Sequence, residues 1–140
     1  MVSAPPRTIL MIEDNPFDAQ ILRDALQHIG EPCELNVIED PLRALQFFDE
    51  FQPGDSRPCL IILDLHFPRV DGATILRSLR AHPLLRDVPV AALPSLASPS
   101  EQRAVMDLGV DLYRTKPIGW EETLQLASEL ISLCRRGIRS

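Results

Sequence analysis

Lysine is almost absent from this sequence. Of its 14 basic residues, 13 are arginine, and the only lysine is Lys116. Lysine carries a compact charge on a flexible stem, whereas arginine presents a planar fork, so the two residues suit different sites. Lys116 is therefore a candidate functional residue, although a chance surface lysine is the alternative on this fact alone.

Cysteine is also scarce, and no metal-binding spacing is present. The cysteines lie far apart and form no CxxC pair, which predicts small, reduced core residues; they are Cys33, Cys59 and Cys134. The histidines do not show the spacing of zinc ligands; they are His28, His66 and His82.

Long apolar runs and basic stripes are missing as well. No run approaches the roughly 20 residues of a membrane span, so we expect no membrane association. The net charge of −6 and the lack of a basic stripe argue against nucleic-acid binding. Residues 1–6 show no signal-peptide pattern, so we expect a cytoplasmic protein.

The length and composition indicate one globular domain. The chain has 140 residues, 45% of them hydrophobic and 24% charged, which is enough for one real core and too little for two. We find no repeat, low-complexity segment or domain boundary. We therefore expect a single domain over residues 1–140, ordered over about 7–136, with frayed ends and no output domain.

Five apolar runs alternate with helical patterns. The expected strands are residues 8–12, 35–39, 59–63, 88–93 and 110–115. Asn15 and Asp40 each precede a proline, a typical helix start, and residues 98–101 (Ser-Pro-Ser-Glu) fit a capping box. A third helix follows Asp71, and the last spans about residues 120–136. The alternation predicts an α/β fold with a doubly wound parallel sheet covered by helices on both faces.

Charged residues follow three of these strands. Glu13 and Asp14 end the first strand, Asp64 ends the third, and Lys116 ends the fifth. Because ligands bind outside the carboxyl ends of parallel strands, these side chains are expected to meet at one edge. Three close carboxylates repel each other unless a cation joins them, and their hard oxygens suit Mg²⁺. The pattern predicts a magnesium site beside an exposed Asp64.

Each acidic residue also has a simpler interpretation. Asp64 alone is a common turn-starting aspartate, and Glu13 and Asp14 alone are acids favoured at a helix N-terminus. We prefer the functional interpretation because Lys116 ends another strand at the same edge.

These residues carry a resemblance to the receiver domains of response regulators over nearly the whole chain. The matching pieces are Ile12-Glu13-Asp14-Asn15, Leu63-Asp64-Leu65, Pro68 with Gly72, Val88-Pro89-Val90 and Thr115-Lys116-Pro117. The resemblance implies a five-stranded (βα)5 fold of the flavodoxin-like, CheY-like type, with strand order 2-1-3-4-5.

The resemblance also implies a signalling site. Asp64 would accept a phosphoryl group from a histidine kinase, with Mg²⁺ held by Glu13, Asp14, Asp64 and the backbone carbonyl of His66. Lys116 would contact the phosphoryl group. The chain would be a phosphoacceptor and not an enzyme, with at most slow loss of its own phosphoryl group.

Further features are implied around this site. The bond between Lys116 and Pro117 would be cis, and Tyr113 matches an aromatic switch position. Residues 67–72 (Phe-Pro-Arg-Val-Asp-Gly) and the absence of an output domain resemble stand-alone regulators of phytochrome-type histidine kinases, so such a kinase is the expected partner.

Position 94 departs from the family pattern. The family has serine or threonine here, and proline has neither a hydroxyl nor an N–H. Ser95 is a possible substitute. We expect Asp64 to remain competent for phosphorylation while its coupling to Tyr113 is weakened.

Two other functions are open. A phosphate-independent pseudo-receiver that acts as a binding module would explain Pro94. An aspartyl phosphatase is disfavoured, because the second residue after the nucleophile is His66 where such enzymes have an acid.

The last helix has more apolar positions than one face requires. One stripe contains Leu124, Ala127, Ile131 and Cys134, and it is widened by Leu126, Leu130 and Leu133. This width indicates either deep burial or an exposed patch. We expect a homodimer through the fourth and fifth helices and the fifth strand.

Overall fold

The computed structural model describes residues 7–136, which form five strands and five helices in strict alternation. The strands are β1 (Arg7–Ile12), β2 (Cys33–Ile38), β3 (Leu60–Leu63), β4 (Val90–Ala92) and β5 (Leu112–Tyr113). The helices are α1 (Pro16–Ile29), α2 (Pro41–Glu50), α3 (Gly72–Ala81), α4 (Pro99–Asp107) and α5 (Gly119–Arg136). The predicted frayed ends lie outside the described residues.

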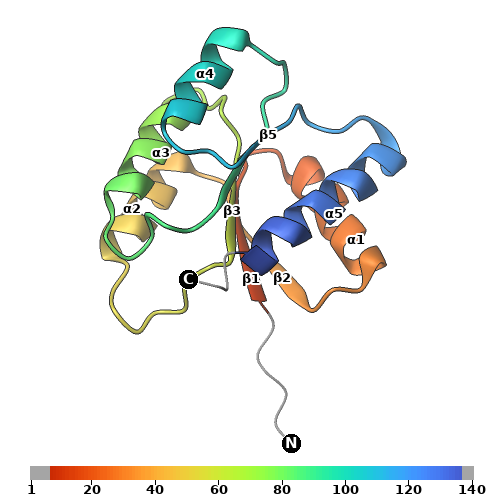
Figure 1. Cartoon of the computed structure of the whole chain (residues 1–140), viewed down its shortest axis with the longest axis horizontal. Helices are drawn as coiled ribbons and strands as arrows, with labels where there is room; N and C mark the ends of the chain where they lie inside the picture. Colours follow the sequence, from red (N-terminus) through yellow and green to blue (C-terminus); the bar gives the residue numbers. More distant parts are fainter. Residues whose placement is uncertain (1–6, 137–140) are drawn as a thin grey trace, which may run out of the picture.

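The strands form one parallel sheet in the order β2-β1-β3-β4-β5, which confirms the predicted fold class and strand order. Helices α1 and α5 cover one face, and α2, α3 and α4 cover the other (Figure 1). All four residues of β3 are buried, as predicted for a central strand between two helical layers.

Helix starts follow the predicted cap chemistry. The Asn15 side chain accepts hydrogen bonds from backbone N–H groups of the first turn of α1, and Asp40 does the same for α2. Asp71 caps α3 in the same way. Gly30 ends α1 with φ of 84°, a left-handed conformation that glycine adopts without strain.

Strands β4 and β5 are shorter than predicted. Prolines flank the β4 core at positions 89 and 94 and cannot donate ladder hydrogen bonds. The N–H of Val90 is instead satisfied by the Asp111 carboxylate at 2.9 Å. The regular ladder between β4 and β5 is therefore limited to two residue pairs.

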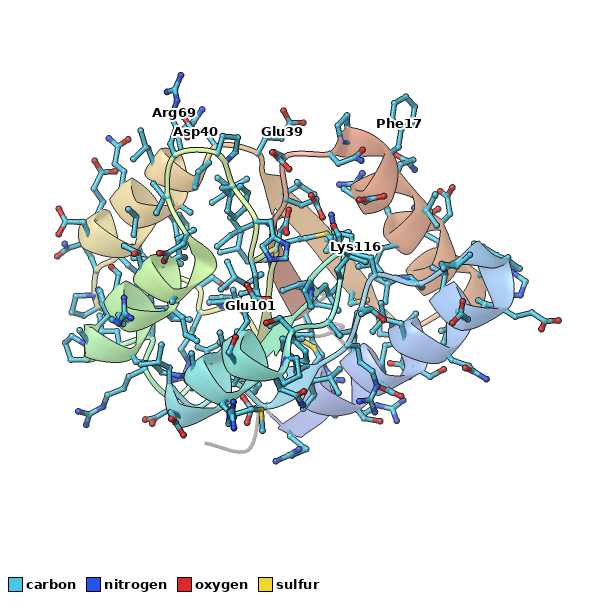
Figure 2. The ribbon with its side chains drawn as sticks, turned by 90° about the horizontal axis from the view of Figure 1, so that it is seen from above. Phe17, Glu39, Asp40, Arg69, Glu101 and Lys116 are labelled. Atoms are coloured by element: carbon cyan, nitrogen blue, oxygen red, sulfur yellow. A yellow bond between two sulfur atoms is a disulfide. The ribbon has the colours of Figure 1, made fainter. Side chains whose placement is uncertain are left out.

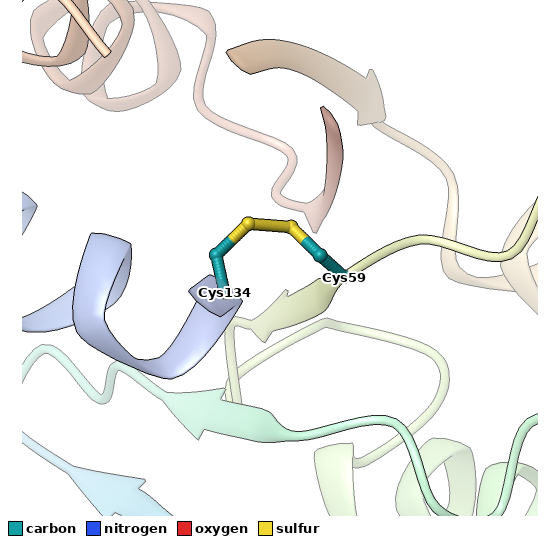
Figure 3. Close-up of a disulfide and its surroundings, with 2 residues drawn as sticks. All are labelled: Cys59 and Cys134. Carbon is teal, nitrogen blue, oxygen red and sulfur yellow. A yellow bond between two sulfur atoms is a disulfide. The ribbon is translucent and has the colours of Figure 1, made fainter. Parts of the chain in front are cut away.

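The cysteine prediction was wrong for two of the three residues. Cys59, just before β3, and Cys134, near the end of α5, form a disulfide across 75 residues (Figure 3). Their Cα atoms lie 4.7 Å apart, within the range a disulfide requires. Sequence spacing did not reveal that α5 packs its last turn against the beginning of β3. Cys33 is free, and burial raises the pKa of its thiol.

The broad apolar surface of α5 is explained by burial within the chain. Its buried apolar residues pack against α1 and the sheet; they are Leu126, Ala127, Leu130, Ile131, Leu133 and Cys134. Leu124 is half-buried. The width of this stripe therefore gives no support to the predicted homodimer. No helix within residues 7–136 combines the length and apolar character that crossing a membrane requires.

Candidate functional site

Strand register brings the predicted acidic residues together. Ile12 of β1 is paired with Leu63 of β3, so Glu13 and Asp64 follow at the same level of the sheet. The N–H of Asp64 donates to the carbonyl of Ile12 at 3.0 Å. One carboxylate oxygen from each of Glu13, Asp14 and Asp64 lies within 4.8 Å of the others.

These carboxylates differ in burial. Glu13 is fully buried, Asp64 is 3% exposed, and Asp14 is exposed. The expectation of an exposed Asp64 was therefore wrong. Its Oδ1 accepts a hydrogen bond from the backbone N–H of His66 at 3.0 Å, so the following loop folds over the side chain.

Burial also changes the acidity of Glu13. It raises the pKa of Glu13 to about 7, and the nearby charge of Asp64 acts in the same direction. The Lys116 ammonium and the N–H of Asn15, which donates to Glu13 Oε2 at 3.2 Å, oppose this shift.

Lys116 reaches the same edge of the sheet from the segment after β5. Its Nζ lies 2.9 Å from Glu13 Oε1, 2.9 Å from Asp18 Oδ2 and 3.6 Å from Asp64 Oδ2. Burial disfavours the ammonium charge, but the hydrogen bond to Asp18 and the ion pair with Glu13 outweigh this effect and raise the pKa of Lys116. Seen from above, Lys116 lies near the middle of the molecule and Phe17 at its outer edge (Figure 2).

Asp18 is a site residue that the sequence did not reveal. It lies in the first turn of α1, where an acid is already favoured by the helix dipole. Its bond to Lys116 joins residues 98 positions apart. Only the position of α1 beside the end of β1 brings this carboxylate to the site.

The donor set fits a hard divalent cation. The carboxylates of Glu13, Asp18 and Asp64 lie around one ammonium, that of Lys116. Asp14 adds a further carboxylate beside Glu13 and Asp64, so negative charge is in excess. Carboxylate oxygens are the ligands that Mg²⁺ prefers, and the exposed Asp14 leaves room for the water molecules that Mg²⁺ retains. The site therefore has the chemistry for one magnesium ion held by Glu13, Asp14 and Asp64.

The Lys116–Pro117 bond was predicted to be cis, and it is trans, since residues 7–136 contain no cis peptide. Trans is the default for a bond before proline. The N–H of Lys116 donates to the carbonyl of Pro94 at 2.9 Å, which anchors this segment beside the end of β4.

The three residues predicted around the switch lie in different environments. Pro94 and Tyr113 are buried, whereas Ser95 is exposed. None of the hydrogen bonds described for residues 7–136 involves the Ser95 hydroxyl. The proposed substitute hydroxyl is therefore not directed to the site by any such bond in this structure.

The capping box of α4 is only half formed. Ser98 Oγ accepts from the N–H of Glu101 at 3.3 Å, as predicted. The N–H of Ser98, however, donates to the Tyr113 hydroxyl at 3.2 Å and not to the Glu101 carboxylate. That carboxylate instead accepts from the Tyr113 hydroxyl at 3.3 Å, and its other oxygen lies 2.9 Å from His66 Nε2. The bridging position of Glu101 was not predicted.

Known proteins resemble this chain over most of its length. A family model described as the response regulator receiver domain matches residues 9–128. Response regulator Rcp1 of Synechocystis sp. is 32% identical over 116 residues, which are 81% of this chain and 79% of Rcp1.

Solved structures give the same result. The Mn²⁺-bound form of Rcp1 has a TM-score of 0.78 at 28% identity, covering 91% of this chain and 93% of that one. The phosphorylated cyanobacterial phytochrome response regulator RcpA has a TM-score of 0.81 at 26% identity, covering 93% and 94%.

Proposed function

This chain belongs to the response-regulator receiver family, and from that membership we propose that it accepts a phosphoryl group on Asp64 from a histidine kinase. The observation that supports this most strongly is the convergence of Glu13, Asp14 and Asp64 within 4.8 Å, with the Lys116 ammonium 3.6 Å from Asp64.

The proposed reaction is a phosphoryl transfer. A carboxylate oxygen of Asp64 forms a bond to phosphorus while the phosphorus–nitrogen bond of the kinase phosphohistidine breaks, and the imidazole nitrogen leaves with the electron pair. Lys116 stabilises the negative charge on the phosphoryl oxygens, and Glu13, Asp14 and Asp64 hold the metal. Bound Mg²⁺ supplies further neutralisation of that charge, and the backbone carbonyl of His66 is its proposed fourth protein ligand.

Turnover of external phosphate esters is disfavoured. A phosphatase of this type needs a general acid near the nucleophile, but the second residue after Asp64 is His66, whose ring is paired with Glu101. We therefore propose a phosphoacceptor and not a hydrolase.

We propose a phytochrome-type histidine kinase as the phosphoryl donor. Two of the similar structures support it: RcpA is described as a phytochrome response regulator, and a regulator from R. palustris with 26% identity is described as acting in red light signalling. Because histidine kinases use ATP, we place this exchange in the cytoplasm.

We also propose a homodimer through α4, β5 and α5. Met106 on α4 and Leu96 in the loop before it are exposed apolar residues that such an interface could cover. Light scattering at tens of micromolar protein tests the proposal, and a monomer mass would contradict it.

Phosphotransfer with Mg²⁺ tests the main proposal. Acetyl phosphate and a phosphorylated phytochrome-type kinase are each mixed with wild type and with Asp64→Asn, which keeps the side-chain shape but cannot form an acyl phosphate. We expect one phosphoryl group on wild type and none on the variant. Absence of labelling on wild type would favour the phosphate-independent pseudo-receiver.

A further inference from the structure

Residues from the loop after Asp64 to β5 form a continuous series of contacts. The N–H of His66 donates to Asp64 Oδ1 at 3.0 Å, and the His66 ring lies 2.9 Å from one oxygen of Glu101. The other oxygen of Glu101 accepts from the Tyr113 hydroxyl at 3.3 Å. One carboxylate on α4 therefore joins the phosphoacceptor loop to a buried tyrosine on β5.

The side chain at position 94 cannot link the loop after Asp64 to Tyr113 by a hydrogen bond. Pro94 has no hydroxyl, and its carbonyl is occupied by the N–H of Lys116 at 2.9 Å. Ser95, the next residue, is exposed. The polar contact between the loop after Asp64 and Tyr113 thus depends on Glu101.

Tyr113 is held at the beginning of α4 by two hydrogen bonds to its hydroxyl. Ser98 N–H donates to it at 3.2 Å, and the hydroxyl donates to Glu101. Since the Ser98 N–H is satisfied by Tyr113, the Glu101 carboxylate is not needed for the helix cap and remains available to His66. A shift of Glu101 would change the hydrogen bonding of Tyr113 directly.

We propose that Glu101 is the positioning residue through which a change at Asp64 reaches Tyr113, in place of a hydroxyl at position 94. This inference rests on the proposed function, because it requires Asp64 to be modified. Conversion of Asp64 to an acyl phosphate weakens Oδ1 as an acceptor for the His66 N–H, so the loop and the His66 ring move. The Glu101 carboxylate follows the His66 ring, and its hydrogen bond with the Tyr113 hydroxyl changes.

A simpler interpretation predicts no such coupling. The His66 and Glu101 side chains are 47% and 27% exposed, and ion pairs of this kind contribute little to stability. The contacts would then be a surface pair beside a capped helix, and Tyr113 would respond to Asp64 equally well without Glu101.

The chain contains a single tyrosine, which makes a direct test possible. Fluorotyrosine incorporation gives one ¹⁹F resonance, from position 113. The probe is Mg²⁺ with beryllium fluoride, which mimics a phosphoryl group on an aspartate, and acetyl phosphate labelling is followed in parallel by intact mass. The variants are Glu101→Gln and His66→Ala with their double mutant, and Asp107→Asn is the control because it removes an exposed carboxylate from the same helix.

We expect beryllium fluoride to move the resonance in wild type and in Asp107→Asn. Glu101→Gln should keep phosphoryl incorporation within about twofold of wild type but lose more than about half of the shift, and adding His66→Ala should reduce the shift little further, because both residues belong to one series of contacts. An undiminished shift in Glu101→Gln, or independent losses from the two substitutions, would overturn the inference while leaving phosphorylation intact. Failure of wild type to incorporate phosphoryl would instead reject the proposed function, and this inference with it.

Discussion

The Asp18 carboxylate accepts a 2.9 Å hydrogen bond from the ammonium of Lys116, 98 residues further along the chain. Lys116 is therefore shared between Asp18 and Glu13, and it lies 3.6 Å from Asp64. Loosening either of these two short contacts would free the ammonium, which has three N–H donors, to move closer to a phosphoryl group on Asp64.

Asp18→Asn should lower stability slightly and accelerate phosphorylation. Because both side chains of the pair are partly exposed, we expect a loss of only about 1 kcal/mol in urea unfolding. Release of the ammonium should raise the labelling rate with acetyl phosphate by roughly two- to tenfold, equivalent to at most ~1.4 kcal/mol. Asp24→Asn, an exposed change on the same helix, is the control. Slower labelling would indicate that Asp18 positions Lys116 for the reaction.

Magnesium binding should strengthen with pH because of Glu13. Burial raises the pKa of Glu13 from its ordinary 4.5 to about 7, so between these values the folded, metal-free chain holds a proton that the unfolded chain releases. The stability that the protonated Glu13 gives to the metal-free fold is fully present below pH 4.5, and it is lost as the pH rises through about 7. Mg²⁺ requires the ionised form, so its affinity should fall by up to about tenfold per pH unit below 7.

Thermal unfolding with and without Mg²⁺, from about pH 6 to about pH 8, measures this effect. The stabilisation by Mg²⁺ should increase with pH in wild type. Glu13→Gln should bind Mg²⁺ more weakly and show a flatter pH dependence. A pH-independent affinity in wild type would contradict the role of Glu13 as a buried metal ligand.

Gly72→Ala should distort the loop that follows Asp64. A Cβ at this position would lie 2.7 Å from Leu65 Cα and 3.3 Å from the Asp64 carbonyl oxygen, too close without a backbone shift. We expect a loss of about 1–3 kcal/mol in unfolding free energy, accompanied by weaker Mg²⁺ binding. Gly54→Ala serves as the comparison: its φ of 95° makes alanine strained, but its Cβ meets nothing within 4 Å. It should reduce stability without changing Mg²⁺ affinity, and equal effects of both variants on binding would refute the explanation.

Arg80→Lys should be more damaging than a conservative change usually is. The Arg80 guanidinium donates to four backbone carbonyls in two separate segments, those of Arg86 and Val88 and those of Leu108 and Gly109. A lysine ammonium cannot span this fork, so we expect a loss of about 2–3 kcal/mol in urea unfolding. Arg77→Lys, an exposed change on the same helix, should stay within about 0.5 kcal/mol of wild type. Similar losses for both variants would show that the four carbonyl contacts contribute little.

Local sequence patterns were sufficient to predict a parallel sheet and the starts of α1 and α2. Apolar runs ending in acids identified β1 and β3, and Asn15 and Asp40 marked the first turns of α1 and α2. Each of these features depends on neighbours within a few residues or on the alternation of elements, so periodicity and cap chemistry were enough.

Contacts between distant side chains could not be predicted in the same way. The Cys59–Cys134 disulfide, the bond from Lys116 to Asp18 and the bridge from His66 to Glu101 join residues 75, 98 and 35 positions apart. Each depends on how a helix tilts against the sheet and on which rotamer its side chain adopts. Composition and spacing contain no such information, and Glu101 in particular had a satisfactory local interpretation as a capping residue.

The most direct test of the account is to locate the phosphoryl group on the chain. Wild type is labelled with acetyl phosphate and Mg²⁺ and then treated with borohydride, which reduces an aspartyl phosphate to homoserine, and its peptides are sequenced by mass spectrometry. We predict homoserine at position 64 alone, dependent on Mg²⁺ and absent from Asp64→Asn. Homoserine at position 14 or 18, or labelling that persists in Asp64→Asn, would contradict the assignment of Asp64 as the phosphoacceptor.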